Sequence, residues 1–157
     1  MNKVIGPFWS NVTAGMLADD LVGIYCMMGS NVPGNPAGSI LMATGSKPPL
    51  NNWHYITCVA DGTNLRIFVN GNQVNSVAIS ALTHSRSENT APLILGRFSV
   101  SFNGLIDDVR IYSAAMPLAY IQEQYLQGLQ SLLANNGITE QEYNQRMAEF
   151  NQNLVLK

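Results

Sequence analysis

Two dipeptides, Asp61-Gly62 and Asn70-Gly71, divide the middle of the chain into short segments and restrict the folds it can adopt. Asn-Gly is the strongest short hairpin signal, because a type I′ turn needs positive φ at both central positions. Between the two turns, Leu65, Ile67 and Val69 occupy alternate positions, which is the period of a strand. The pattern predicts antiparallel strands joined by tight turns.

Further short strands are expected on both sides of these turns. The runs 21–28, 39–44, 53–60, 93–97 and 104–112 are typical of strands, and polar or Gly- and Pro-rich loops separate them. Residues 1–20 show no clean period. Because no helical pattern lies between the strands, the sequence predicts an antiparallel β-sandwich, mainly β in class, over about residues 1–113.

The remaining residues, 114–157, are expected to form a helical hairpin. Pro117 suits a first helical position, and Asn135-Asn136-Gly137 ends the first helix with Gly137 as its left-handed residue. Thr139 and Glu142 form a capping box, and Ile138 with Tyr143 is spaced as a hydrophobic staple. The sequence therefore predicts two short helices joined by a tight turn.

Each predicted helix carries an apolar stripe, and a two-helix hairpin cannot bury both stripes alone. The hairpin either packs back on the sandwich or meets the same element of another subunit. We expect a homo-oligomer that self-associates through apolar residues of the tail, namely Leu129, Leu132, Leu133, Met147, Phe150 and Leu154.

Three features in a fixed order carry a family resemblance: the pair Trp53-His54, the two Gly-containing turns, and the segment Phe102–Tyr112. Together they resemble the C-terminal half of a laminin-G-like jelly roll of the concanavalin A-like lectin/glucanase superfamily, whose final strand reads roughly F-x-G-x-I-D-D-V-R-I-Y. The resemblance implies a jelly-roll sandwich. Complete jelly rolls of this kind have further strands ahead of the Trp-His strand, so we expect this sandwich to be incomplete at its N-terminal side.

The acidic pair Asp107-Asp108 raises the question of catalysis. Adjacent side chains on a strand point to opposite faces, whereas glycoside hydrolysis needs two carboxylates across one cleft. We therefore expect structural roles, with Asp107 partly inward and Asp108 sharing the other face with Arg110. The resemblance likewise implies packing roles for Trp53 and His54.

No constellation for an enzyme or a metal site is evident, so we expect a protein without catalytic activity or cofactor. His54 and His84 are the only histidines, which leaves no cluster for zinc. Some members of the superfamily hold calcium, and calcium stays an alternative here. However, Asp61 and Glu88 are the only loop acids between Asp20 and Asp107, and neutral oxygens alone bind calcium weakly.

The two cysteines, Cys26 and Cys58, both lie in apolar strand-like runs. They could form a disulfide if their strands are neighbours, but buried free thiols are the preferred prediction.

The charge pattern argues against two kinds of partner, nucleic acid and the membrane surface. A net charge of −2 with 11% charged residues provides neither a basic stripe for nucleic acid nor a polybasic membrane patch. The early apolar run 21–28 is too short to span a bilayer, and no signal peptide is evident. We expect an extracellular, cell-surface or virion protein.

We expect a non-catalytic recognition or adhesion module that binds a glycan or a protein partner through its loops. The alternative is a structural subunit of a virion or surface filament. Sugar recognition uses aromatic platforms with amide hydrogen bonds, and the candidate ligand-binding residues are Asn31, Asn35, Asn89, Phe98, Phe102 and Asn103.

Overall fold

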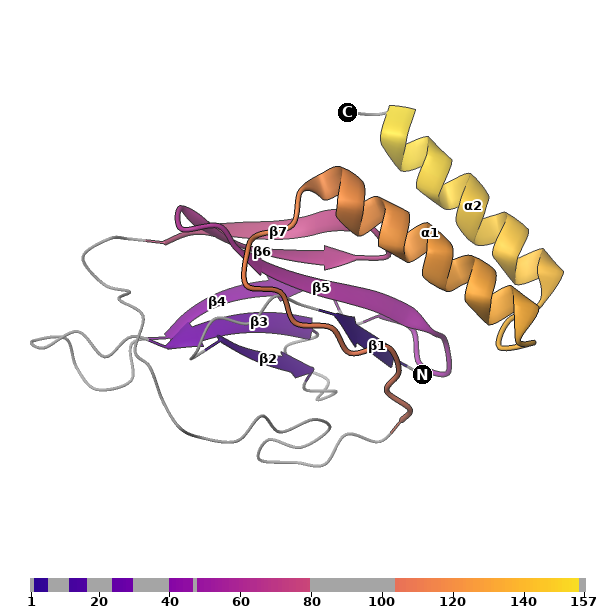
Figure 1. Cartoon of the computed structure of the whole chain (residues 1–157), viewed down its shortest axis with the longest axis horizontal. Helices are drawn as coiled ribbons and strands as arrows, with labels where there is room; N and C mark the ends of the chain where they lie inside the picture. Colours follow the sequence, from indigo (N-terminus) through magenta and orange to yellow (C-terminus); the bar gives the residue numbers. More distant parts are fainter. Residues whose placement is uncertain are drawn as a thin grey trace, which may run out of the picture.

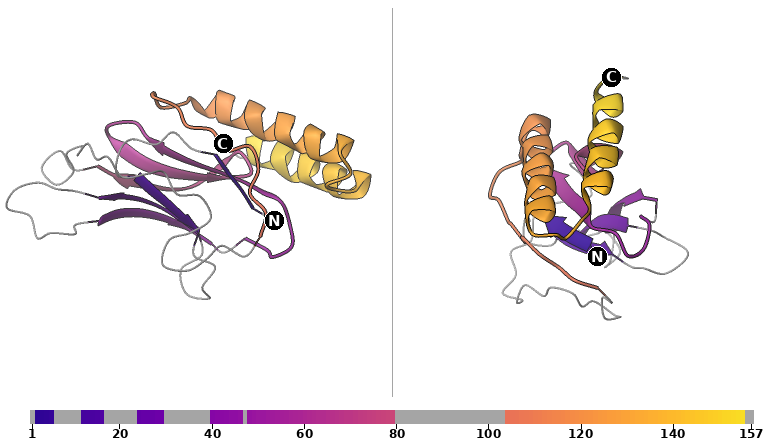
Figure 2. Two further views of the ribbon diagram at one scale, coloured as in Figure 1. Left: turned by 60° about the horizontal axis from the view of Figure 1, so that its bottom comes forward. Right: turned by 90° about the vertical axis from the view of Figure 1, so that its right-hand side faces the viewer.

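The computed structural model describes residues 2–5, 12–16, 24–29, 40–46, 48–79 and 104–155. Its described elements are seven strands and two helices, arranged as a helical hairpin, a four-stranded sheet and a three-stranded sheet (Figure 1). The hairpin lies on the side of the four-stranded sheet that faces away from the other sheet (Figure 2). The expected sandwich followed by a helical hairpin is confirmed.

The four-stranded sheet has the order β1-β5-β6-β7. Antiparallel pairing joins β5 to β6 and β6 to β7, as the two turns predicted. The first strand departs from this pattern, because β1 pairs with β5 in parallel, with Asn2 opposite His54. The bounds of the strands are Asn2–Ile5 for β1, His54–Ala60 for β5, Asn64–Val69 for β6 and Asn72–Ala78 for β7.

The three-stranded sheet is antiparallel and contains β2 (Val12–Met16), β3 (Ile24–Gly29) and β4 (Ile40–Gly45). The last two correspond to the predicted runs 21–28 and 39–44. The first was missed, as was β1, because residues 1–20 carry no clear alternation. The N-terminal part of the chain therefore contributes a strand to each sheet.

Strand β5 is buried along its whole length, since both of its faces are covered. Ile56, Cys58 and Ala60 face the three-stranded sheet and pack in the inter-sheet core. Tyr55 and Val59 point the other way and pack against the helices. This alternation follows from the two-residue period of a strand, and it makes β5 the centre of a three-layer molecule.

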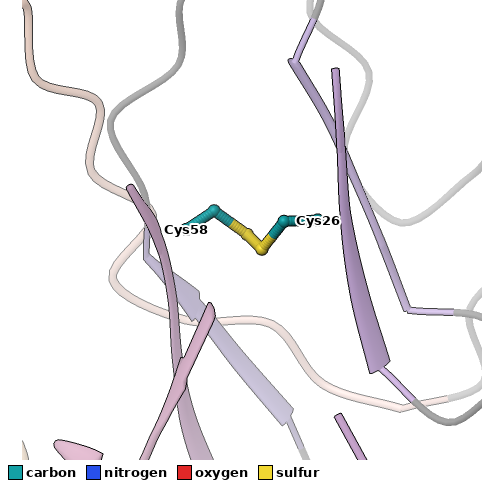
Figure 3. Close-up of a disulfide and its surroundings, with 2 residues drawn as sticks. All are labelled: Cys26 and Cys58. Carbon is teal, nitrogen blue, oxygen red and sulfur yellow. A yellow bond between two sulfur atoms is a disulfide. The ribbon is translucent and has the colours of Figure 1, made fainter. Parts of the chain in front are cut away.

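A disulfide joins Cys26 of β3 to Cys58 of β5 across the inter-sheet core (Figure 3). The two Cα atoms are 5.9 Å apart, within the usual range for a disulfide. The preferred prediction of free thiols is therefore wrong. Both strands turn these side chains inward at facing positions, and the sequence alone does not show which strands face each other.

The β6–β7 turn has the predicted positive φ at both central residues, 51° at Asn70 and 77° at Gly71. Asn70 bonds both backbone groups of Tyr55: its N–H donates to the Tyr55 carbonyl at 2.8 Å, and its Oδ1 accepts from the Tyr55 N–H at 3.0 Å. A Cβ added to Gly71 would lie 3.0 Å from Cε2 of Phe150. Conformation and close packing thus both favour glycine here.

The helices are α1 (Leu118–Ala134) and α2 (Glu140–Val155). Pro117 is the N-cap of α1 instead of its first helical residue. The left-handed residue that ends α1 is Asn136, with φ 55°, and not Gly137 as predicted. The N–H of Gly137 donates to Leu132 O and that of Asn136 to Leu133 O, which is the Schellman pattern. Gly137 is favoured by a close approach instead, since an added Cβ would lie 3.0 Å from Cδ2 of Leu132.

Half of the predicted capping box of α2 is present: the Glu142 N–H donates to Oγ1 of Thr139 at 3.1 Å, while the Glu142 carboxylate pairs with Arg146. Beyond it, the hairpin packs back on the sandwich. Leu129 and Phe150 are buried against Tyr55, Val59 and Phe68 of the sheet, while other residues of the stripes, Leu132, Leu133 and Met147, are partly buried on the same core. Leu154 is 45% exposed.

The segment 104–112 was predicted to be the last strand, but the structure shows no strand there. Leu105 and Ile111 are 52% and 46% exposed. Asp108 has a left-handed φ of 50°, which interrupts the extended backbone that a continuous strand needs. This prediction is therefore wrong for the described chain, although Tyr112 still packs against the helical core.

Candidate functional site

A cleft of about 590 Å³ lies between the end of β4, the start of β5 and the β6–β7 turn. Both sheets contribute to it, because β4 belongs to one and β5, β6 and β7 to the other. Its volume lies within the range of small-ligand sites. The residues that line it are Thr44, Gly45, Ser46, Pro48, Pro49, His54, Val69, Asn70 and Val74.

The described lining combines hydrogen-bonding and apolar groups without a charged side chain. Thr44 and Ser46 carry hydroxyls and Asn70 carries an amide, while proline and valine residues form the apolar part. Such a surface can bind neutral polar molecules, because their hydroxyl or amide groups find partners and their C–H surfaces find apolar contacts.

The side-chain amide of Asn70 is held in a fixed orientation. Its Oδ1 accepts the Tyr55 N–H, and the Asn70 backbone N–H returns a bond to the Tyr55 carbonyl. The other end of the amide, Nδ2, has no hydrogen-bond partner among the described residues. It is therefore a donor on a cleft-lining side chain that the turn itself positions.

His54 supports the wall of the cleft. Its Nε2 donates to the Pro49 carbonyl at 2.8 Å, and because a carbonyl only accepts, Nδ1 is the unprotonated nitrogen. Nδ1 is buried without a partner in the described part of the chain. Burial lowers the pKa of His54 below its usual value, with the nearby Arg146 adding to the effect and the Pro49 bond opposing it. Neutral His54 thus anchors the loop around Pro49.

A second cavity lies beneath the helical hairpin, between residues 53–55 at the start of β5 and Tyr125, Leu129 and Arg146 of the helices. Its volume of about 10 Å³ is close to the space that one water molecule needs. It is therefore too small for an organic ligand. Trp53 borders it and is half-buried against the helical core.

Asp107, Asp108 and Arg110 are exposed and do not line the cleft. Oδ1 of Asp107 accepts the Asp108 N–H at 2.8 Å, and Asp108 lies 3.9 Å from the guanidinium of Arg110. Arg110 also donates to Oε1 of Gln124 in α1. The expectation that Asp107 points partly inward is wrong, because the segment does not continue as a strand on the core.

The ligand-binding residues predicted from the sequence lie outside the described residues; they are Asn31, Asn35, Asn89, Phe98, Phe102 and Asn103. Conversely, sequence reasoning did not select any cleft residue as a ligand contact. Asn70 was interpreted only as a turn residue, and Pro48-Pro49 only as a loop. The signal that could have been used was Asn70, because an asparagine in a tight turn carries an amide that can bind a ligand. The sequence does not show that this turn lies beside the Pro-rich loop.

Two further observations concern metals and membranes. Within the described ranges, no three His, Cys, Asp or Glu side chains come together as a metal site. Neither α1 nor α2 is long and apolar enough to cross a bilayer, and no other helix occurs in the described chain.

Comparison with protein families agrees with the fold. A family model described as the concanavalin A-like lectin/glucanases superfamily matches residues 21–122. No curated protein matches the chain. Among solved structures, the chain is similar to an S-layer domain-containing protein (residues 221–444) of Clostridium thermocellum, with 16% identity over 75% of this chain and 70% of that chain and a TM-score of 0.38.

Proposed function

Because this chain belongs to the concanavalin A-like lectin/glucanase superfamily, we propose that it is a non-catalytic recognition module that binds a glycan or a protein partner through the loops of its sandwich. The observation that carries the proposal is the cleft at the end of the sandwich, with its neutral, hydrogen-bonding lining. Recognition needs a shaped site and hydrogen-bonding groups, and the lining of the cleft carries such groups.

The position of the acidic pair supports a non-catalytic role. Retaining and inverting glycosidases place two carboxyl groups on either side of one bond. Asp107 and Asp108 instead follow each other on an exposed segment and contact that segment's own backbone and Arg110. They are better suited to holding this segment beside α1, which Arg110 reaches through Gln124.

The disulfide supports a location outside the cell. Disulfides form and persist in oxidising surroundings such as secreted proteins and cell or virion surfaces. Cys26 and Cys58 are 0% and 2% exposed, so the bond is a structural one inside the core. We therefore propose an extracellular, cell-surface or virion setting.

The six loop residues proposed from the sequence remain part of this hypothesis as ligand contacts. A glycan array probed with the full chain tests it. One reproducible ligand class, weakened by alanine at Phe98 or Phe102, supports recognition through these loops. Hydrolysis of a polysaccharide that disappears in Asp107→Asn or Asp108→Asn would contradict the non-catalytic assignment.

A structural subunit that self-associates is the second candidate, and the exposed ends of the hairpin favour it. Leu118 begins α1 and Leu154 lies in the last turn of α2, so both are at the open end of the hairpin, 39% and 45% exposed. Leu129 and Phe150 are already buried within the chain, which leaves Leu154 as the exposed member of the proposed set. Light scattering on the full chain and on Leu154→Glu tests this: a concentration-dependent mass that the substitution lowers supports assembly, and a constant monomer mass in both excludes it.

A further inference from the structure

We propose that the cleft between the end of β4 and the β6–β7 turn binds a short neutral oligosaccharide. Asn70, Thr44 and Ser46 provide its hydrogen bonds, and Pro48, Pro49, Val69 and Val74 provide its apolar walls. This inference rests on the proposed recognition function and names its ligand class and its site.

The chemistry of the described lining favours a neutral ligand. An anionic or cationic group would lose its hydration in the cleft without a described side chain of opposite charge to compensate. Hydroxyl groups, by contrast, can donate to and accept from Thr44 and Ser46. A sugar ring presents hydroxyls at its edge and C–H groups on its faces, and the cleft offers both kinds of partner.

Asn70 supplies a preorganised donor. The bond from the Tyr55 N–H to Oδ1 holds the amide before any ligand arrives, and the bond from the Asn70 backbone N–H to the Tyr55 carbonyl holds its backbone. A group that is already ordered loses little conformational entropy on binding. Its Nδ2, which has no partner among the described residues, can therefore bond a sugar hydroxyl at a small entropic cost.

Hydrogen bonds and close packing also hold the two sides of the cleft. Nδ2 of Asn75 in β7 donates to the Thr44 carbonyl in β4 at 2.8 Å, which ties one sheet to the other beside the cleft. His54 holds the opposite wall through the Pro49 carbonyl. At Gly45 an added Cβ would lie 3.0 Å from Cγ2 of Val74, so the glycine lets β4 and β7 approach closely. Contacts within the fold thus join the elements on both sides of the cleft.

The primary test is a titration of the isotopically labelled full chain, followed by NMR, with maltotriose, cellotriose, tri-N-acetylchitotriose and sialyllactose as probes. We expect at least one neutral probe to shift the side-chain amide signal of Asn70. We also expect it to bind more tightly than sialyllactose.

A blocking substitution locates the site. Val74 is 46% exposed and lines the cleft, so Val74→Trp fills the cleft from its rim. Ile111→Trp is the matched control, because Ile111 is equally exposed and does not line the cleft. We expect Val74→Trp to lower the affinity at least about tenfold and Ile111→Trp to leave it unchanged.

A second substitution tests the donor. Asn70→Asp keeps Oδ1 for the Tyr55 N–H and removes the Nδ2 donor. Asn136→Asp makes the same change at another left-handed position, at the end of α1. Loss of one uncharged hydrogen bond predicts a decrease in affinity of about three- to tenfold for Asn70→Asp only.

The outcomes separate the two hypotheses. If a neutral sugar binds equally well to the wild type and to Val74→Trp, the site lies elsewhere; the inference is overturned and glycan recognition stands. If sialyllactose binds in the cleft more tightly than the neutral probes, the ligand class is wrong. If no probe shifts the Asn70 signal and the glycan array is also silent, the inference and glycan recognition both fail.

Discussion

The guanidinium of Arg146 donates a hydrogen bond of 2.6 Å to the backbone carbonyl of Trp53, 93 positions earlier in the chain. This bond joins the second helix of the tail to Trp53, the residue immediately before β5. Arg146 also pairs with Glu142 one turn earlier at 2.5 Å, and its side chain is only 11% exposed. The tail is therefore joined to the sandwich by a directed polar contact as well as by its apolar stripe.

Replacing this arginine should loosen the tail. We expect Arg146→Met, which keeps much of the apolar stem, to lower the free energy of unfolding by about 1–3 kcal/mol, because the Trp53 carbonyl loses its charged donor. The control is Arg66→Met, which breaks the ion pair between Arg66 and Asp61 at the surface and should change stability by about 1 kcal/mol or less. Urea unfolding measures both. Amide exchange in α2 should become faster only in Arg146→Met; equal losses of stability would contradict the docking role.

Two turn glycines, one between β5 and β6 and one between β6 and β7, allow the effect of close packing on stability to be separated from that of backbone conformation. Gly62 and Gly71 both have positive φ, but an added Cβ at Gly62 meets nothing within 4 Å, whereas at Gly71 it meets Phe150. Alanine at either position should lose about 1–2 kcal/mol from the left-handed backbone. Gly71→Ala should lose roughly 1–3 kcal/mol more from overpacking. Thermal or urea unfolding of the two variants checks the difference, and a partial rescue of Gly71→Ala by Phe150→Leu would identify the clash as its cause.

The disulfide should contribute substantially to stability. It closes a loop between residues 32 positions apart, for which chain-entropy arguments predict roughly 3–4 kcal/mol. We expect the double variant Cys26→Ala with Cys58→Ala to lose about this much in urea unfolding. Alkylation followed by mass spectrometry should find no free thiol in the wild type. Reduced wild-type protein should match the double variant closely, and equal stability of the oxidised and reduced forms would refute a structural role for the bond.

Protonation linked to His54 should lower the free energy of unfolding in mild acid. Burial keeps the pKa of His54 below its usual value near 6.5, so the unfolded chain takes up a proton before the folded one does. The free energy of unfolding therefore falls as the pH drops below about 6.5, and it stops falling from this cause below the lowered pKa. Urea midpoints measured across this range check the slope, and His54→Gln should reduce it. A wild-type midpoint that rises toward acid would contradict the prediction.

The sequence predicted those features that depend on neighbours along the chain. The alternation of Leu65 and Ile67, the positive φ of the Asn70-Gly71 turn and the cap from Thr139 to the Glu142 N–H all appear as expected. Each depends on backbone torsion angles and on groups a few residues apart. The family assignment has the same origin, because turn chemistry and strand pattern recur in order along the chain.

The pattern of neighbouring residues did not decide the structure where two local conformations were both possible. At the end of α1, either Asn136 or Gly137 could take the left-handed conformation. In the structure Asn136 takes it, and Gly137 instead lies where an added Cβ would approach Leu132 and Nε1 of Trp53. Likewise, the alternation in 104–112 predicted a strand, but a strand also needs a partner and an uninterrupted extended backbone, which the left-handed Asp108 does not provide.

Only the tertiary structure decided which distant residues meet. It pairs Cys26 with Cys58, seats Phe150 beside Gly71, and brings the end of β4 next to the β6–β7 turn to form the cleft. The sequence by itself determined that the chain would form short antiparallel strands, tight turns and two capped helices, because these depend on torsion angles and short-range hydrogen bonds. The disulfide and the cleft depend on how the two sheets and the hairpin stack, and stacking follows from the burial of apolar faces contributed by residues far apart in the chain.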